Sequence, residues 1–149
     1  MIYYRNAVRR SGVDGRALLA AARRILSELD EGESSLSLTL VGDAAIRTIN
    51  REHRGKDAPT DVLSFPMHPE SSGAERMLGD VVISVETARR QAAQYGATLQ
   101  RELYRLLIHG VLHLLGHDHL KAGERRVMER EERRLAKAVG LPWPYQDAG

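Results

Sequence analysis

The feature that most restricts how this chain can fold is a run of four histidines within eleven residues, H-G-V-L-H-L-L-G-H-D-H, at positions 109–119. His109 and His113 are four residues apart, and on an α-helix this spacing places two side chains one turn apart on the same face. Gly116 then predicts the end of the helix and a sharp change of chain direction. Such a turn can bring His119 back toward the two helical imidazoles.

Three imidazoles arranged in this way can hold one metal ion. Three protein ligands leave one position of a tetrahedral ion open, which is typical of a catalytic zinc site. The alternative is that one or two of these histidines are ordinary core or surface residues, as most single histidines are. The complete spacing with its helix-ending glycine favours the metal site. The chain has no cysteine, which excludes thiolate zinc sites, cysteine-ligated clusters and disulfides.

The residues between the predicted ligands indicate which class of hydrolase the metal site could serve. We expect His117 to point elsewhere if its neighbours bind a metal. Asp118 either orients a metal-binding histidine or caps the turn, and the sequence leaves both open. Gly110 stands where the metzincin pattern HExxHxxGxxH has the glutamate that serves as general base. A peptidase is therefore disfavoured: the base lies elsewhere, or the metal lowers the pKa of water to about 7 without help.

A second polar cluster lies in a predicted loop and in the strand that follows it. It includes Arg54, Lys56, Thr60, Asp61 and Ser64. A guanidinium near an open metal position can bind a substrate phosphate and offset charge that develops on it. An ordinary surface ion pair of Arg54 with Glu52 or Asp57 is the other interpretation, and spacing alone favours it. The Thr60–Asp61 pair is equally suited to fixing the loop.

The pattern of apolar residues predicts strands interspersed with helices, followed by helices alone. Strands are expected over 2–6, 35–41, 61–65 and 78–85, and helices over 15–29, 44–50, 86–95, 99–115 and 122–139. Asp14, Asp43 and Thr98 are the expected N-caps, and loops are expected over 51–60 and 66–77. This order indicates an α+β or mixed-sheet α/β fold, and 149 residues fit a single domain. The last helix reads as a solvated helix with i,i+4 ion pairs.

Charge and hydropathy exclude some classes of protein. The net charge is only +2, although 19 of the 22 basic residues are arginine. Arginine suits phosphate binding, but composition bias and solvated helix faces explain the excess equally well. The N-terminus is too charged for a signal peptide, and the longest apolar stretch, 106–115, is too short to cross a bilayer. We therefore expect a cytoplasmic protein.

Three motifs together resemble the YbeY family of bacterial endoribonucleases, also called rRNA maturation factors. The motif HGxLHLxGxDH is matched by His109, Gly110, Leu112, His113, Leu114, Gly116, Asp118 and His119. An Asn…Arg…PT(D/N)VLSFP segment is matched by Asn50, Arg54 and 59–66. The motif LGD(I/V)xIS is matched by Leu78, Gly79, Asp80, Val81, Ile83 and Ser84. The motifs occur in the family's order and extend over about half of the chain.

The resemblance implies a fold, a site and partners. The fold would be a zincin-like α+β domain with a four-stranded mixed sheet and about five helices. His109, His113 and His119 would bind one zinc ion, and Arg54 would be the catalytic or RNA-contacting arginine. The implied substrate is single-stranded RNA, in 16S rRNA 3′-end maturation and ribosome quality control. The implied partners are the small ribosomal subunit and a ribosome-associated GTPase, with no membrane and no DNA.

The leading hypothesis is therefore a metal-dependent endoribonuclease, with attack by water or by the RNA 2′-OH left open. A second hypothesis is a ribosome-assembly binding factor in which the metal mainly stabilises the fold. A third is a metal-dependent hydrolase of another substrate. A metallopeptidase is the least favoured, because position 110 lacks a glutamate.

Overall fold

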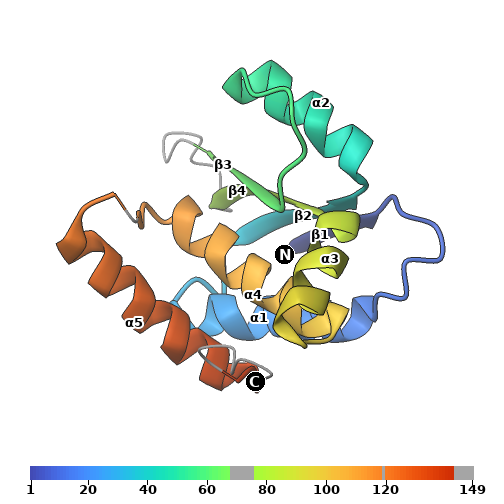
Figure 1. Ribbon diagram of the computed structural model, residues 1–149. Coiled ribbons are helices and arrows are strands. Elements are labelled where there is room, and N and C mark those ends of the chain that lie inside the picture. The colour runs from blue at the N-terminus through green and yellow to red at the C-terminus, as the bar shows by residue number, and fades with distance from the viewer. Residues whose placement is uncertain (68–75, 119, 143–149) are drawn as a thin grey trace.

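The computed structural model describes residues 1–67, 76–118 and 120–142. In this part of the chain, four strands form one sheet in the order β1-β2-β4-β3 (Figure 1). β1 (Ile2–Asn6), β2 (Ser35–Val41) and β4 (Met77–Ser84) run parallel, whereas β3 (Val62–Pro66) is antiparallel to β4. The sheet is therefore mixed, and β3 forms one of its edges.

Five helices accompany the sheet in the described residues. They are α1 (Gly15–Glu28), α2 (Asp43–Arg54), α3 (Val85–Tyr95), α4 (Leu99–Leu114) and α5 (Ala122–Ala138). Two of the predicted N-caps are confirmed, because Asp14 accepts a hydrogen bond from the backbone N–H of Ala17 and Thr98 accepts one from Arg101. The α+β fold with a four-stranded mixed sheet and five helices is as the sequence predicted.

The two faces of the sheet are covered differently. α1, α4 and α5 pack together on one side, while α2 lies on the other (Figure 1). The larger core is built from alternate strand residues such as Leu38 and Ile83 packed against buried residues of α1 and α4. A smaller core joins Val41, Val82 and Leu63 to Ile46 of α2. The strands are therefore buried on both faces near their centre, which holds α2 and α4 on opposite sides of the sheet.

α2 differs from the sequence prediction at both ends. Its N-cap is Gly42, not Asp43, and it continues to Arg54 instead of ending at Asn50. The helix ends where Gly55 adopts a φ of 69°, and its N–H bonds the carbonyl of Arg51. The last turn is polar and exposed, so its composition resembles that of a loop. The loop predicted over 51–60 is wrong for its first four residues.

Other elements agree with the prediction to within a residue or two. β3 begins and ends one residue later than expected. The boundary between β4 and α3 lies one residue earlier than expected. Most of the loop predicted over 66–77 falls outside the described residues. In α5, Arg134 forms an i,i+3 ion pair with Glu131 and a second contact with Glu28 of α1.

Among the described residues, no helix combines the length and the apolar composition that a bilayer-spanning segment requires.

Candidate active site

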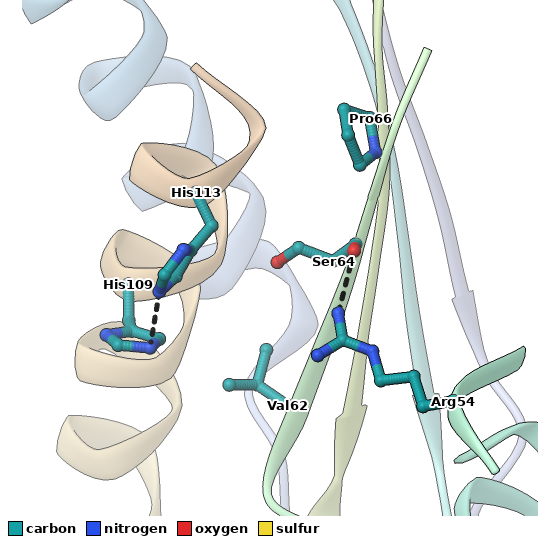
Figure 2. A pocket seen from close by; sticks show the side chains of 6 residues that line it. All are labelled: Arg54, Val62, Ser64, Pro66, His109 and His113. Atoms are coloured by element: carbon teal, nitrogen blue, oxygen red, sulfur yellow. Dashed lines mark hydrogen bonds between the residues drawn. The ribbon is translucent and has the colours of Figure 1, made fainter. Parts of the chain in front are cut away.

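A cavity of about 270 Å³ lies between α4 and the edge strand β3. It is lined by Arg54, Val62, Ser64, Pro66, His109 and His113 (Figure 2). Alternation along β3 places Val62, Ser64 and Pro66 on the side that faces α4. The cavity therefore brings the two sequence clusters, which are about fifty residues apart in the chain, into one site.

The two histidines of α4 point toward each other from successive turns (Figure 2). Their Nε2 atoms are 3.1 Å apart, and the rings meet nearly edge to face with centroids 4.5 Å apart. Two nitrogens bound to one zinc at about 2.0–2.1 Å in tetrahedral geometry are separated by roughly 3.3–3.4 Å. The separation in the structure is close to that value. A hydrogen bond between one protonated and one bare nitrogen fits it as well.

The packing of α4 fixes the orientation of this pair. Leu106, Leu107, Ile108, Val111 and Leu112 are all buried, whereas His109 and His113 are half-buried and border the cavity. Rotation of the helix would expose apolar side chains to water. The imidazoles are therefore held toward β3 by the core beneath them.

The predicted third ligand, His119, lies outside the described residues. Within the described part of the chain, no three His, Cys, Asp or Glu side chains are grouped to hold a metal. The turn that precedes His119 is visible: Gly116 has a φ of 93°, and the N–H of His117 bonds the carbonyl of Leu112. Asp118 lies on this half-buried turn, and it does not cap α5, whose N-cap is Lys121.

Gly110 allows α4 to approach the sheet closely. A Cβ atom at this position would lie 2.8 Å from Cγ1 of Val81 and 3.2 Å from Oγ of Ser64. Real Cβ atoms essentially never approach another atom within 3.0 Å. The position that carries the general base in the metzincin pattern therefore has no room for a side chain in this fold.

Arg54 reaches the cavity from the end of α2. One of its terminal nitrogens donates to the backbone carbonyl of Ser64 at 3.3 Å, and its guanidinium lies 5.9 Å from the ring of Phe65. The ion pair with Glu52 or Asp57 that spacing favoured does not form in the described residues. Asp57 instead pairs with Arg47 at 2.8 Å, so the charge of Arg54 is directed at the cavity.

The loop after α2 is tied down by three polar residues. Asn50 is buried and donates to the carbonyl of Ala58 at 2.9 Å. Asp61 accepts from the N–H of Val62 at 2.7 Å and from Nε2 of Gln91 at 3.2 Å. Asp61 thus fixes the start of β3, in agreement with the prediction that the Thr60–Asp61 pair fixes the loop. Lys56 is exposed and does not line the cavity.

Sequence reasoning missed the connection across the cavity. The hydroxyl of Ser64 donates to the carbonyl of Gly110 at 3.1 Å, which joins β3 to α4 between the two histidines. The alternation of 62, 64 and 66 along the strand indicates which side chains share a face. It does not indicate which helix lies opposite, so the partner of Ser64 required the structure.

Comparison with known proteins identifies the family. The sequence model described as "Endoribonuclease YbeY" matches residues 4–140. The chain belongs to the YbeY family. This confirms the resemblance that the three motifs indicated.

Curated YbeY relatives are similar over most of the chain. An "Endoribonuclease YbeY" from Anaeromyxobacter sp. is 50% identical over 126 residues, and one from Moorella thermoacetica is 46% identical over 140 residues. Each comparison covers 85% of this chain. The chain spans 65% of the length of the Anaeromyxobacter relative and 90% of the Moorella relative.

A solved structure has the same fold. The solution structure of TM1509 from Thermotoga maritima superposes with a TM-score of 0.67 at 25% sequence identity. The match covers 93% of this chain and 89% of that one. The YbeY family assignment and the observed architecture therefore agree.

Proposed function

We propose that this protein is a metal-dependent endoribonuclease that cleaves single-stranded RNA. The observation that carries the proposal is that an imidazole pair and a guanidinium line one cavity. The relatives named "Endoribonuclease YbeY" support RNA as the substrate. Following the family resemblance, we place its action in 16S rRNA 3′-end maturation and ribosome quality control in the cytoplasm. The proposed partners are the small ribosomal subunit and a ribosome-associated GTPase, and the chain would act as one catalytic domain.

We assign one zinc ion per chain to His109, His113 and His119. The 3.1 Å separation of the first two Nε2 atoms supports this assignment, and so does the absence of cysteine, which leaves His and carboxylates as ligands. Bound zinc would act as a Lewis acid toward a phosphoryl oxygen of the substrate. Asp118 is proposed to orient a ligand histidine from the turn after α4.

Arg54 is the proposed catalytic residue that binds the scissile phosphate. Its guanidinium carries a permanent charge, and among the described residues no carboxylate neutralises it. Held by the carbonyl of Ser64, it faces the imidazole pair across the cavity (Figure 2). It would stabilise the negative charge that develops on phosphorus as the attacking oxygen adds.

The close approach of α4 to the sheet argues against a peptidase. Peptide hydrolysis in metzincins uses a glutamate beside the first histidine. Here that position is Gly110, and Val81 and Ser64 fill the space that a side chain would need. The cavity instead combines cationic and metal-binding groups, which suits a phosphodiester.

The test compares the parent with His113→Ala, both purified without added metal. Zinc content is measured by elemental analysis, and cleavage is measured on an end-labelled single-stranded RNA with and without zinc. We expect one zinc per parent chain, zinc-dependent cleavage, and loss of both in the variant. His53→Ala is the control, because His53 is exposed in the last turn of α2 and does not line the cavity.

Two outcomes would overturn the proposal. Cleavage by metal-free His113→Ala at the parent rate would show that the nuclease is a contaminant or uses another site. A folded His113→Ala that loses zinc but retains ribosome binding and biological activity would instead indicate an assembly factor with a structural metal.

A further inference from the structure

We propose that the Ser64 hydroxyl accepts a hydrogen bond from a ribose 2′-OH and so lets this site distinguish RNA from DNA. The inference rests on the proposed nuclease function and assigns a specificity-determining residue to it. Ser64 lies on β3 and borders the same cavity as Arg54, His109 and His113.

The hydroxyl proton of Ser64 already takes part in a hydrogen bond within the protein. A serine hydroxyl has one hydrogen to donate and two lone pairs that accept. In this structure the hydroxyl donates to the carbonyl of Gly110 at 3.1 Å. What Ser64 offers to a molecule in the cavity is therefore acceptor capacity.

Ser64 is also held firmly on both sides. Its backbone carbonyl accepts a hydrogen bond from Arg54 at 3.3 Å, while its hydroxyl is bonded to α4. Gly110 brings the helix so close that a Cβ atom there would lie 3.2 Å from Oγ of Ser64. The acceptor is therefore fixed beside the proposed phosphate-binding guanidinium.

The other cavity-lining groups have different chemistry. Arg54 has donors only, Val62 and Pro66 are apolar, and His109 and His113 are the proposed metal ligands. In a sugar-phosphate backbone the phosphate and ring oxygens only accept, and the 2′-OH is the one donor that RNA has and DNA lacks. Because Arg54 and Ser64 line one cavity, a phosphate held by Arg54 brings its neighbouring 2′-OH, the donor that RNA alone supplies, to the side of the cavity that Ser64 lines.

The experiment is a mutant cycle between protein and substrate. A short single-stranded RNA is prepared with one nucleotide at a time changed to 2′-deoxy, and kcat/KM is measured for the parent and for Ser64→Ala. We expect one nucleotide at which the deoxy change lowers kcat/KM for the parent by about 3- to 10-fold, the range of one hydrogen bond. For Ser64→Ala this penalty should shrink to less than 2-fold.

Two further variants separate recognition from packing. Ser64→Thr retains a hydroxyl on a strand residue and should keep the deoxy penalty. Ser37→Ala, a serine-to-alanine change on β2 outside the cavity lining, should leave it unchanged. If Ser64 only braced the cavity, its removal would slow cleavage of RNA and deoxy substrates equally, and an unchanged penalty at every nucleotide would overturn the inference.

Failure of the proposed function has a separate signature. If the parent shows no cleavage that depends on His113, the nuclease proposal fails, and binding of RNA and DNA of the same sequence is compared by fluorescence anisotropy. A preference for RNA that disappears in Ser64→Ala still supports the inference, and equal affinities in the parent overturn it. If the 2′-OH is itself the nucleophile that attacks phosphorus, a deoxy change at that nucleotide abolishes cleavage whether or not Ser64 is present. Recognition of that nucleotide is then measured by comparing the affinities of the RNA and its deoxy form by fluorescence anisotropy.

Discussion

Gly110 is the residue whose replacement should be most informative about how the site is built. We predict that Gly110→Ala destabilises the protein by about 1–3 kcal/mol, because the new methyl group would overlap Cγ1 of Val81 at 2.8 Å. The higher helix propensity of alanine offsets up to about 1 kcal/mol of that cost. The free energy of unfolding is measured by urea denaturation, and RNA cleavage should fall because α4 and its histidines must shift.

The chain offers a matched control for this change. Gly123 also lies in a helix, but a Cβ atom there would meet nothing within 4 Å. Gly123→Ala should therefore leave stability unchanged or raise it by up to about 1 kcal/mol. Equal effects of the two changes would show that Gly110 is not needed for close packing of α4 on the sheet.

At the scale of single residues, spacing predicts neighbours on one helix but not partners across the fold. The i,i+4 spacing of His109 and His113 placed both imidazoles on one face, and the 3.1 Å contact agrees with that. The ion-pair interpretation of Arg54 failed for a different reason. Asp57 lies ten residues after Arg47, and they meet only because the chain turns back at Gly55.

At the scale of elements, α2 and α3 are joined by a network around Asp43. Its carboxylate accepts hydrogen bonds from Oγ of Ser84 at 2.6 Å, from Oγ1 of Thr87 at 2.6 Å and from Arg90 at 2.8 Å. In return, Glu86 of α3 accepts a hydrogen bond from the backbone N–H of Asp43 at 2.8 Å. Each helix thus supplies a carboxylate to the start of the other, which holds α2 and therefore Arg54 in place.

This network predicts a pH-dependent stability. Burial alone would raise the pKa of Asp43, but hydrogen bonds from Ser84, Thr87 and Arg90 outweigh it and hold the pKa below its ordinary value of 3.8. The carboxylate therefore stabilises the fold above that value, and the contribution is lost as the pH falls through the lowered pKa. Asp43→Asn should cost about 1–3 kcal/mol at neutral pH.

The measurement is urea denaturation of the parent and Asp43→Asn at neutral pH and at about pH 3. The difference in the free energy of unfolding should be smaller at the lower pH, because below 3.8 the unfolded chain binds a proton that Asp43 in the folded protein resists. A difference that is the same at both values would show that the charge of Asp43 does not contribute to stability.

The same network explains why α2 was the element predicted least well. Thr98 and Asp14 cap their own helices through local hydrogen bonds, and apolar periodicity identified α1 and α4. The start of α2 depends on Glu86, which is 43 residues away in the sequence. Its last turn projects polar side chains into solvent, so neither end carries a local apolar signal.

At the scale of the whole molecule, charge pairing limits how RNA can bind. The net charge is only +2 despite 19 arginines. The described arginines that pair with carboxylates at 3.0 Å or less include Arg24, Arg47, Arg76, Arg90, Arg105 and Arg134. Much of the positive charge is therefore compensated locally, and Arg54 in the cavity is one cation that is not.

This distribution predicts a shallow salt dependence of RNA binding. Each phosphate contacted on a single strand contributes about −0.7 to the slope of log affinity against log salt concentration. With few phosphates contacted near the cavity, we expect a slope of about −2 or shallower. Arg54→Ala should make the slope shallower by about 0.7, whereas Arg24→Ala, which removes a cation paired with Glu28 on α1, should leave it unchanged. Binding is measured by fluorescence anisotropy over a range of salt concentrations, and a slope of about −5 or steeper would place RNA on a broad arginine surface outside the cavity.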